Sequence, residues 1–182
     1  MTKRAIIVVD FQNEYLPTGK LPLTGMDHAL ANAARLIDAA RDGGEALFHV
    51  RHEFAEPDAQ VFVPGSDGVE TISAVAPAEG EPVVLKNYPN AFRGTNLKQQ
   101  LDEQDIEEVV IIGAMSHMCV EGTSRAASDL GYAVTVVEDA CATMELEFHN
   151  TKVPAAQVHA TAMAALAFAY ASITGTEAYL AG

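Results

Sequence analysis

The sequence of 182 residues has little positive charge and few cysteines. It contains 11 Lys and Arg residues against 25 Asp and Glu residues, which gives a formal net charge of -14 at pH 7. Such an acidic surface repels phosphate backbones, so we do not expect nucleic acid as a partner. The two cysteines, Cys119 and Cys141, are too few for a disulfide framework, and they form neither a C-x-x-C motif nor a zinc-type spacing.

Signals for export and for membrane insertion are also missing. The first apolar run stops at Asp10 without a small-residue cleavage pattern, so residues 5–9 are interpreted as a strand and not as part of a signal peptide. The alanine-rich stretch 155–171 is short for a membrane span and contains Gln157 and His159. We therefore expect a cytoplasmic protein with reduced thiols and no membrane partner.

Internal repeats, low-complexity tracts and interdomain linkers are absent as well, which predicts a single domain over residues 1–182. The composition is 49% hydrophobic and 20% charged, as is ordinary for a globular protein, and the chain is long enough to bury a substantial core.

Apolar runs alternate with stretches of helical periodicity along the chain. Asp27 is expected to cap the first helix, and Gly43-Gly44 to end it. The alternation predicts an α/β protein with a three-layer α/β/α Rossmann-like fold, in which a six-stranded, mainly parallel sheet is covered on both faces. The expected strands are residues 5–9, 46–50, 82–85, 106–112, 133–137 and 171–174, and the later helices are 95–104, 119–130 and 154–170.

The stretch 113–125 is the most informative part of the sequence. It follows the apolar strand 106–112, and the pattern after it predicts a tight turn and then a helix that begins at or near Cys119. A thiol at a helix start is exposed to unpaired N–H groups that favour the thiolate. The alternative is a buried structural cysteine, because cysteine is among the residues most often buried.

Three reactive side chains follow predicted strands: Asp10 the first, Lys86 the third and Cys119 the fourth. Ligands of open parallel sheets bind at the carboxyl ends of strands, so the fold can bring these side chains together. Lys86 would lower the pKa of the thiol, and the carboxylate would shuttle a proton. Backbone N–H groups of the turn 115–119 would hold an oxyanion. This set predicts nucleophilic addition to a carbonyl-type carbon and a thioester. Taken singly, Asp10 fits a strand end as well as a catalytic role, and a lysine such as Lys86 is more often a solvated loop residue, so only the set supports catalysis.

Several segments in order along most of the chain match one family pattern: 7–13, 64–66, Lys86 with 90–97, 112–120 with Thr123, 129–132 and 138–141. Through these segments the chain resembles the isochorismatase-like cysteine hydrolases, a family that includes nicotinamidases and N-carbamoylsarcosine amidases. The resemblance implies a six-stranded parallel sheet and a catalytic triad of Cys119, Asp10 and Lys86. It also implies a cis peptide bond between Ala114 and Met115, which aims the N–H of Met115, beside that of Cys119, at the substrate oxygen.

Two departures from the family pattern narrow the function. The segment 49–54 lacks the Asp-x-His of metal-binding nicotinamidases, so we expect neither a metal nor another cofactor. Isochorismatases that cleave a vinyl ether need no cysteine nucleophile, so Cys119 favours cleavage of a C–N bond in a small amide, ureide or similar molecule. Enol-ether hydrolysis, a non-catalytic ligand-binding protein and a thiol redox sensor stay open. A nucleotide-binding module is disfavoured, because residues 10–13 are not a glycine-rich phosphate turn.

The substrate pocket is expected to involve Phe11, Tyr15, Phe92 and His117, with specificity set partly by the long loop 51–81. The apolar final helix suggests a homo-oligomer, either a dimer or a tetramer. In such an assembly, residues 148–149 of a neighbouring subunit would reach the pocket. Cys141 is interpreted as structural.

Overall fold

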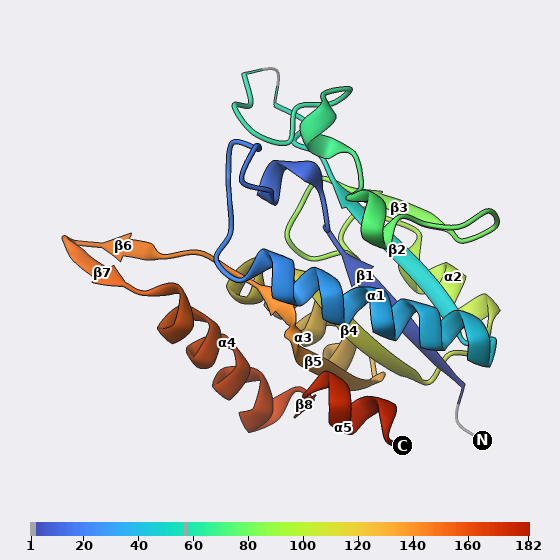
Figure 1. Cartoon of the computed structure of the whole chain (residues 1–182). Coiled ribbons are helices and arrows are strands. Elements are labelled where there is room, and N and C mark those ends of the chain that lie inside the picture. The colour runs from blue at the N-terminus through green and yellow to red at the C-terminus, as the bar shows by residue number, and fades with distance from the viewer. Residues whose placement is uncertain (1–2, 57) are drawn as a thin grey trace.

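The computed structural model describes residues 3–56 and 58–182 and has strands that alternate with helices along most of the chain (Figure 1). The strands are β1 (Arg4–Val9), β2 (Ala46–His52), β3 (Val83–Lys86), β4 (Glu108–Ala114), β5 (Ala133–Ala142), β6 (Leu146–Phe148), β7 (Thr151–Val153) and β8 (Ser172–Thr174). The α-helices are α1 (Met26–Gly43), α2 (Leu97–Glu103), α3 (Glu121–Asp129), α4 (Ala155–Ala169) and α5 (Thr176–Leu180). Single helical turns are η1 (Asn13–Tyr15), η2 (Asp67–Val69), η3 (Ser73–Val75) and η4 (Ser116–Val120).

Six strands form one sheet in the order β3-β2-β1-β4-β5-β8, and all neighbouring pairs are parallel. Side chains of β1 alternate between its two faces: Ala5, Ile7 and Val9 enter one core, and Ile6 and Val8 enter the other. The first core packs against α2, α3 and α4, and the second against α1 and α5. The predicted three-layer fold and its sixth strand are therefore confirmed.

The order of the strands makes β1 and β4 the switch point of the sheet. From β1 the chain moves outward through β2 to β3, and then returns to β4 on the other side of β1. Connections therefore leave β1 and β4 in opposite directions, and ligands of open α/β sheets usually bind beyond the carboxyl ends of such a pair of strands.

Several boundaries differ from the sequence predictions. Helix α1 begins at Met26 after Gly25, whose φ is 77°, so Asp27 lies in the first helical turn and does not cap the helix. Strand β2 continues two residues beyond the predicted end, to His52. Strand β5 continues to Ala142, because a register shift against β4 carries it past the acidic residues 138–139.

Two elements were not predicted at all: helix α5 and the β6–β7 hairpin, which projects from the body of the molecule in Figure 1. His149 and Asn150 form the turn of the hairpin with φ of 46° and 63°. The strongest sequence signal for such a turn is Asn-Gly or Asp-Gly. The pair His149-Asn150 contains no glycine, so the sequence analysis did not predict the hairpin. None of the helices within residues 3–56 and 58–182 is long and apolar enough to cross a membrane.

Candidate active site

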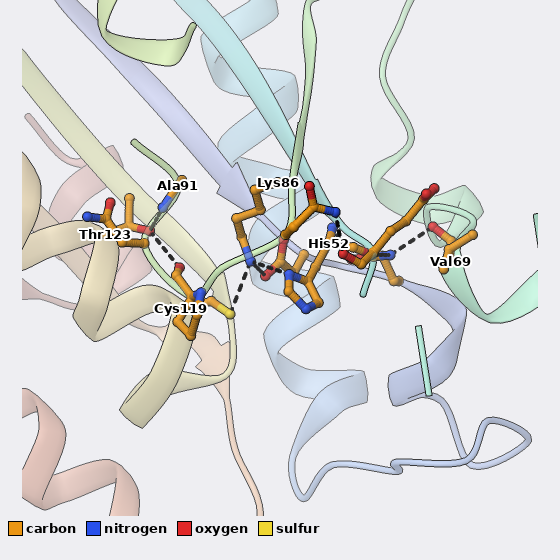
Figure 2. A network of polar contacts seen from close by, with 12 residues as sticks. His52, Val69, Lys86, Ala91, Cys119 and Thr123 are labelled. Carbon is orange, nitrogen blue, oxygen red and sulfur yellow. Dashed lines mark hydrogen bonds and ion pairs between the residues drawn. The ribbon is translucent and has the colours of Figure 1, made fainter. Parts of the chain in front are cut away.

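Asp10, Lys86 and Cys119 meet at the carboxyl ends of the strands. Figure 2 shows the contact between Lys86 and Cys119. The Nζ atom of Lys86 lies 2.7 Å from Oδ2 of Asp10 and 3.2 Å from Sγ of Cys119. The side chains of Lys86 and Asp10 are both 0% exposed. The tertiary structure thus joins three residues that are up to 109 positions apart in the sequence into one buried cluster of a thiol, an ammonium and a carboxylate.

The backbone at Asp10 and at Gly113 shows how β1 and β4 end. Asp10 has a φ of 52°, a left-handed conformation that aspartate adopts more readily than most residues, so the chain turns there out of the strand. Gly113 has a φ of 135°, and a Cβ atom at this position would lie 2.0 Å from the carbonyl oxygen of Val9. Only glycine allows β4 to approach β1 this closely.

The turn that carries Cys119 follows β4 directly. The peptide bond between Ala114 and Met115 is cis, and the carbonyl of Met115 accepts hydrogen bonds from the N–H groups of Met118 at 3.0 Å and Val120 at 3.2 Å. The second of these bonds closes a π-type turn, a geometry that is frequent at functional sites. Cys119 therefore lies two residues before the first residue of α3 and is 6% exposed.

The electrostatics of the cluster contradict one sequence-based expectation. Burial and the carboxylate of Asp10 raise the pKa of the Cys119 thiol, and the Lys86 ammonium opposes this only in part. Lys86 lowers the pKa of the thiol, as expected, but burial and the Asp10 carboxylate outweigh it, so the expected net lowering of this pKa is wrong for the free protein. Burial also raises the pKa of Asp10, although Lys86 lowers it. The resting site holds a neutral thiol beside a carboxylate that is a stronger base than usual.

Sequence reasoning did not single out His52, which lies in the segment 49–54 discussed above only for its lack of a metal-binding pattern. His52 is the last residue of β2 and is paired in register with Lys86 on β3. Its Nδ1 atom lies 3.1 Å from Nζ of Lys86, as Figure 2 shows. A polar side chain at the end of an apolar strand could have drawn attention to His52, as it did to Asp10. The predicted strand ended at residue 50, two residues too early, so His52 was not recognised as a strand end.

Gln12, in the segment after β1, fixes the backbone around His52. Its side-chain amide donates to the carbonyls of His52 at 2.8 Å and Val69 at 2.9 Å, and its side-chain oxygen accepts from the N–H of His52 at 2.8 Å. Gln12 is buried, so these bonds are shielded from water. These bonds join the beginning of the loop 51–81 to the segment that follows β1.

Further contacts of Phe54 and Phe62 join the loop 51–81 to residues near the triad. The carboxylate of Glu14 accepts a hydrogen bond from the N–H of Phe62 at 3.0 Å. The rings of Phe54 and Phe62 pack edge-on against the imidazole of His52, with centroids 4.7 and 5.3 Å away. The loop 51–81, which is expected to set specificity, therefore contacts the imidazole of His52, and this imidazole contacts Lys86.

A second hydrogen-bond network joins the turn that carries Cys119 to β5 and α4. The hydroxyl of Ser116 donates to the carbonyl of Ala142 at 3.2 Å and lies 2.8 Å from Nδ1 of His159 on α4. Nε2 of His159 lies 3.2 Å from the carboxylate of Glu138 on β5. Ser116 is fully buried and its hydroxyl is already hydrogen-bonded within the protein. We therefore interpret Ser116 as a structural residue that fixes the turn and not as a substrate contact.

The four residues expected to line a pocket lie in different surroundings. Phe11 and Tyr15 are buried in the core, and Tyr15 is close enough to the triad for the charges of Asp10 and Cys119 to add to burial in raising its pKa. Phe92 packs on the other core and stacks on Tyr132 at 6.2 Å.

His117 is half-buried and binds Thr143 at 2.7 Å through Nδ1. It lines an apolar cavity of about 280 Å³ together with Phe148 and residues of α4. The structure therefore places His117 at a cavity, whereas Phe11 and Tyr15 pack inside the protein.

The residues around His52 do not fit a metal site. Within the two described stretches of the chain, no three His, Cys, Asp or Glu side chains converge as a ligand set. The Nδ1 atom of His52 faces the Lys86 ammonium, and a metal cation there would be repelled by that charge.

Comparison with known proteins identifies the family of this chain. The family model of the isochorismatase domain matches residues 4–174. The uncharacterized isochorismatase family protein YddQ of Bacillus subtilis is 44% identical over 176 residues, which cover 97% of this chain and 98% of YddQ. A crystal structure from Oleispira antarctica, assigned as an isochorismatase hydrolase, superimposes with a TM-score of 0.96 at 47% identity and covers 100% of this chain and 97% of that one. Nicotinamidase 3 of Arabidopsis thaliana is 30% identical over 80% of this chain and 76% of its own length.

Proposed function

The chain belongs to the isochorismatase family, and we propose that it is a cysteine hydrolase that cleaves a C–N bond of a small amide, ureide or similar molecule. The observation that carries the proposal is the contact of the Lys86 ammonium with both Asp10 and Cys119. A thiol beside a cation that stabilises its thiolate and a carboxylate that can accept its proton has the two partners that activate a cysteine nucleophile. The similarity to a nicotinamidase, which by its name acts on an amide, supports the same class of bond.

In the first half of the reaction, Sγ of Cys119 attacks the carbonyl carbon of the substrate, and the thiol proton passes to the carboxylate of Asp10. Lys86 stabilises the negative charge that develops on sulfur. The backbone N–H groups of Met115 and Cys119 would receive the oxyanion. Collapse of the tetrahedral intermediate breaks the C–N bond, and the departing nitrogen takes the proton from Asp10.

In the second half, water attacks the thioester, and Asp10 accepts a proton from that water. The C–S bond breaks, the sulfur regains a proton and the acid product leaves. One water molecule is consumed and one amine or ammonia is released for each bond cleaved. The raised pKa of Asp10 suits this role, because the group has to take up a proton and give it back in both halves.

The test is a panel of small amides and ureides assayed for release of ammonia or amine, with the parent protein and Cys119→Ala side by side. We expect the variant to be inactive, and intact-protein mass spectrometry of acid-quenched parent enzyme to show an acyl adduct on Cys119. Cleavage by Cys119→Ala at the parental rate would overturn the covalent mechanism. Activity of both proteins on an enol ether, with none on amides, would instead identify isochorismatase-type hydrolysis.

The homo-oligomer remains a prediction of the sequence. Helix α4 contains no Asp, Glu, Lys or Arg residue in a chain of net charge -14, and Phe168 on it is 91% exposed. Such a face is expected to pack against another surface. Multi-angle light scattering at micromolar concentration should give a dimer or tetramer, and a single monomer peak would contradict the prediction.

A further inference from the structure

We propose that His52 is a positioning residue of the active site, whose Nδ1 atom holds the Lys86 ammonium between Asp10 and Cys119. This inference rests on the function proposed above, because it concerns the group that stabilises the attacking sulfur. It assigns a role to a residue that lies outside the triad and comes from a different strand.

The position of Lys86 in the sheet explains why it needs such a partner. Lys86 ends β3, the edge strand, and β2 and β1 lie between it and the strand that leads to Cys119. Neighbouring strands are about 4.8 Å apart, so the lysine side chain has to reach across the end of β2. His52 ends β2 in register with Lys86 and therefore lies on that path. Figure 2 shows its ring against the lysine nitrogen.

The hydrogen bonds of the ammonium lead to the same conclusion. A lysine ammonium has three N–H donors and no acceptor. Three acceptors surround Nζ of Lys86: Oδ2 of Asp10 at 2.7 Å, Nδ1 of His52 at 3.1 Å and Sγ of Cys119 at 3.2 Å. The side chain of Lys86 is completely buried, so water cannot replace a lost acceptor. Without His52, one donor is unsatisfied, and the ammonium is free to move away from the sulfur.

The surroundings of His52 keep it neutral and oriented. Burial and the Lys86 charge lower the pKa of the imidazole to about 3, so it is unprotonated at neutral pH. Contact with the ammonium requires Nδ1 to accept, which leaves the ring proton on Nε2. Phe54 and Phe62 pack edge-on against the ring. An imidazole with so low a pKa is a poor acceptor for a thiol proton, so His52 positions Lys86 and leaves proton transfer to Asp10.

The test measures the rate of iodoacetamide alkylation at Cys119 between pH 6 and 9.5, by mass spectrometry, in the parent, His52→Leu and His52→Asn. We expect His52→Leu to slow alkylation about tenfold at each pH, which is the effect of a thiol pKa raised by one unit. His52→Asn should restore most of the rate, because its side-chain oxygen occupies roughly the position of Nδ1. The matched control is His49→Leu, since His49 is also buried on β2 but contacts Glu81 at 2.9 Å and not Lys86. This control should leave the alkylation profile unchanged.

A purely structural role for His52 predicts the opposite sign. A loosened site moves the buried thiol toward its ordinary, lower pKa, so faster alkylation of His52→Leu would overturn the proposal, as would an unchanged rate. If His52→Leu does not fold, His52→Asn is compared with His52→Gln, which moves the acceptor to the position of Nε2. Equal rates for these two variants would also overturn it.

Lys86→Met separates this inference from the proposed function. If Lys86→Met slows alkylation but His52→Leu does not, only the role of His52 is wrong. If Lys86→Met also leaves the alkylation rate unchanged, the lysine does not stabilise the thiolate, and the covalent mechanism itself loses its support.

Discussion

The two cysteines of this protein are similarly buried but have different neighbours. Cys119 is 6% exposed and Cys141 is 8% exposed, and Cys141 on β5 is paired with Gly113 on the strand that leads to Cys119. Cys119 contacts the Lys86 ammonium, whereas the thiol of Cys141 donates to the carbonyl of Val137 at 3.4 Å. Burial raises the pKa of both thiols, that of Cys141 to about 12.

The comparison shows that exposure does not distinguish a reactive thiol from a structural one in this fold. Both thiols are neutral in the resting protein, and only Cys119 has a base and a cation within contact. The chemistry of the site therefore depends on the buried pair of Asp10 and Lys86, and variants of these residues test the comparison directly.

The largest expected effect is on the rate of hydrolysis when each cysteine is replaced by alanine in a separate variant. Cys119→Ala should reduce hydrolysis about 10⁴-fold or more, as when the nucleophile of a catalytic unit is removed. Cys141→Ala should keep the parental rate, because the thiol of Cys141 donates to the backbone carbonyl of Val137 and is not part of the triad. Steady-state assays of amine release measure both. A comparable loss in the two variants would remove the distinction between the cysteines.

Asp10→Asn should change two properties of Cys119 in opposite directions. Hydrolysis should fall about 10²- to 10⁴-fold, because the variant lacks the general base. Alkylation of Cys119 at pH 8 should become faster, since the Asp10 carboxylate raises the pKa of the thiol and its removal increases the thiolate fraction. Parallel kinetics of hydrolysis and iodoacetamide labelling check this. Slower labelling of the folded variant would mean that Asp10 does not oppose ionisation of the thiol.

Removing one charge of the buried pair should also destabilise the fold. Lys86→Met leaves the Asp10 carboxyl buried without its cation and should lower the free energy of unfolding by about 3–5 kcal/mol. The double variant Lys86→Met with Asp10→Asn removes both charges and should recover most of that loss. Urea denaturation followed by circular dichroism measures the difference. Equal losses in the single and double variants would show that the pair is not the source of the destabilisation.

The smallest effect concerns the pH dependence of the unmodified thiols. Because the pKa of Cys119 is raised, its alkylation rate should increase about tenfold per pH unit and show no plateau at the ordinary thiol pKa of about 8.5. Cys141, whose pKa is raised to about 12, should follow the same slope. A plateau for Cys119 below pH 8.5 would contradict the raised pKa.

Much of the architecture could be predicted from the sequence, because apolar runs and their periods are local properties. The buried strands at residues 5–9 and 106–112 and the helix after Cys119 needed only the pattern of their own residues. The same pattern placed Asp10, Lys86 and Cys119 at strand ends. The β6–β7 hairpin lacked a strong turn signal, and the acidic residues 138–139 concealed the full length of β5.

The sequence by itself thus determined which side chains end the strands, and the similarity of its motifs indicated the class of chemistry. The tertiary structure alone decided the order of the strands, the place of His52 beside Lys86 and the degree of burial of the thiol. These features depend on contacts between residues far apart in the chain, and the pKa of Cys119 depends on all of them together. For this reason the sequence indicated an activated thiol with a lowered pKa, whereas the folded protein holds a neutral thiol in a buried cluster with Asp10 and Lys86.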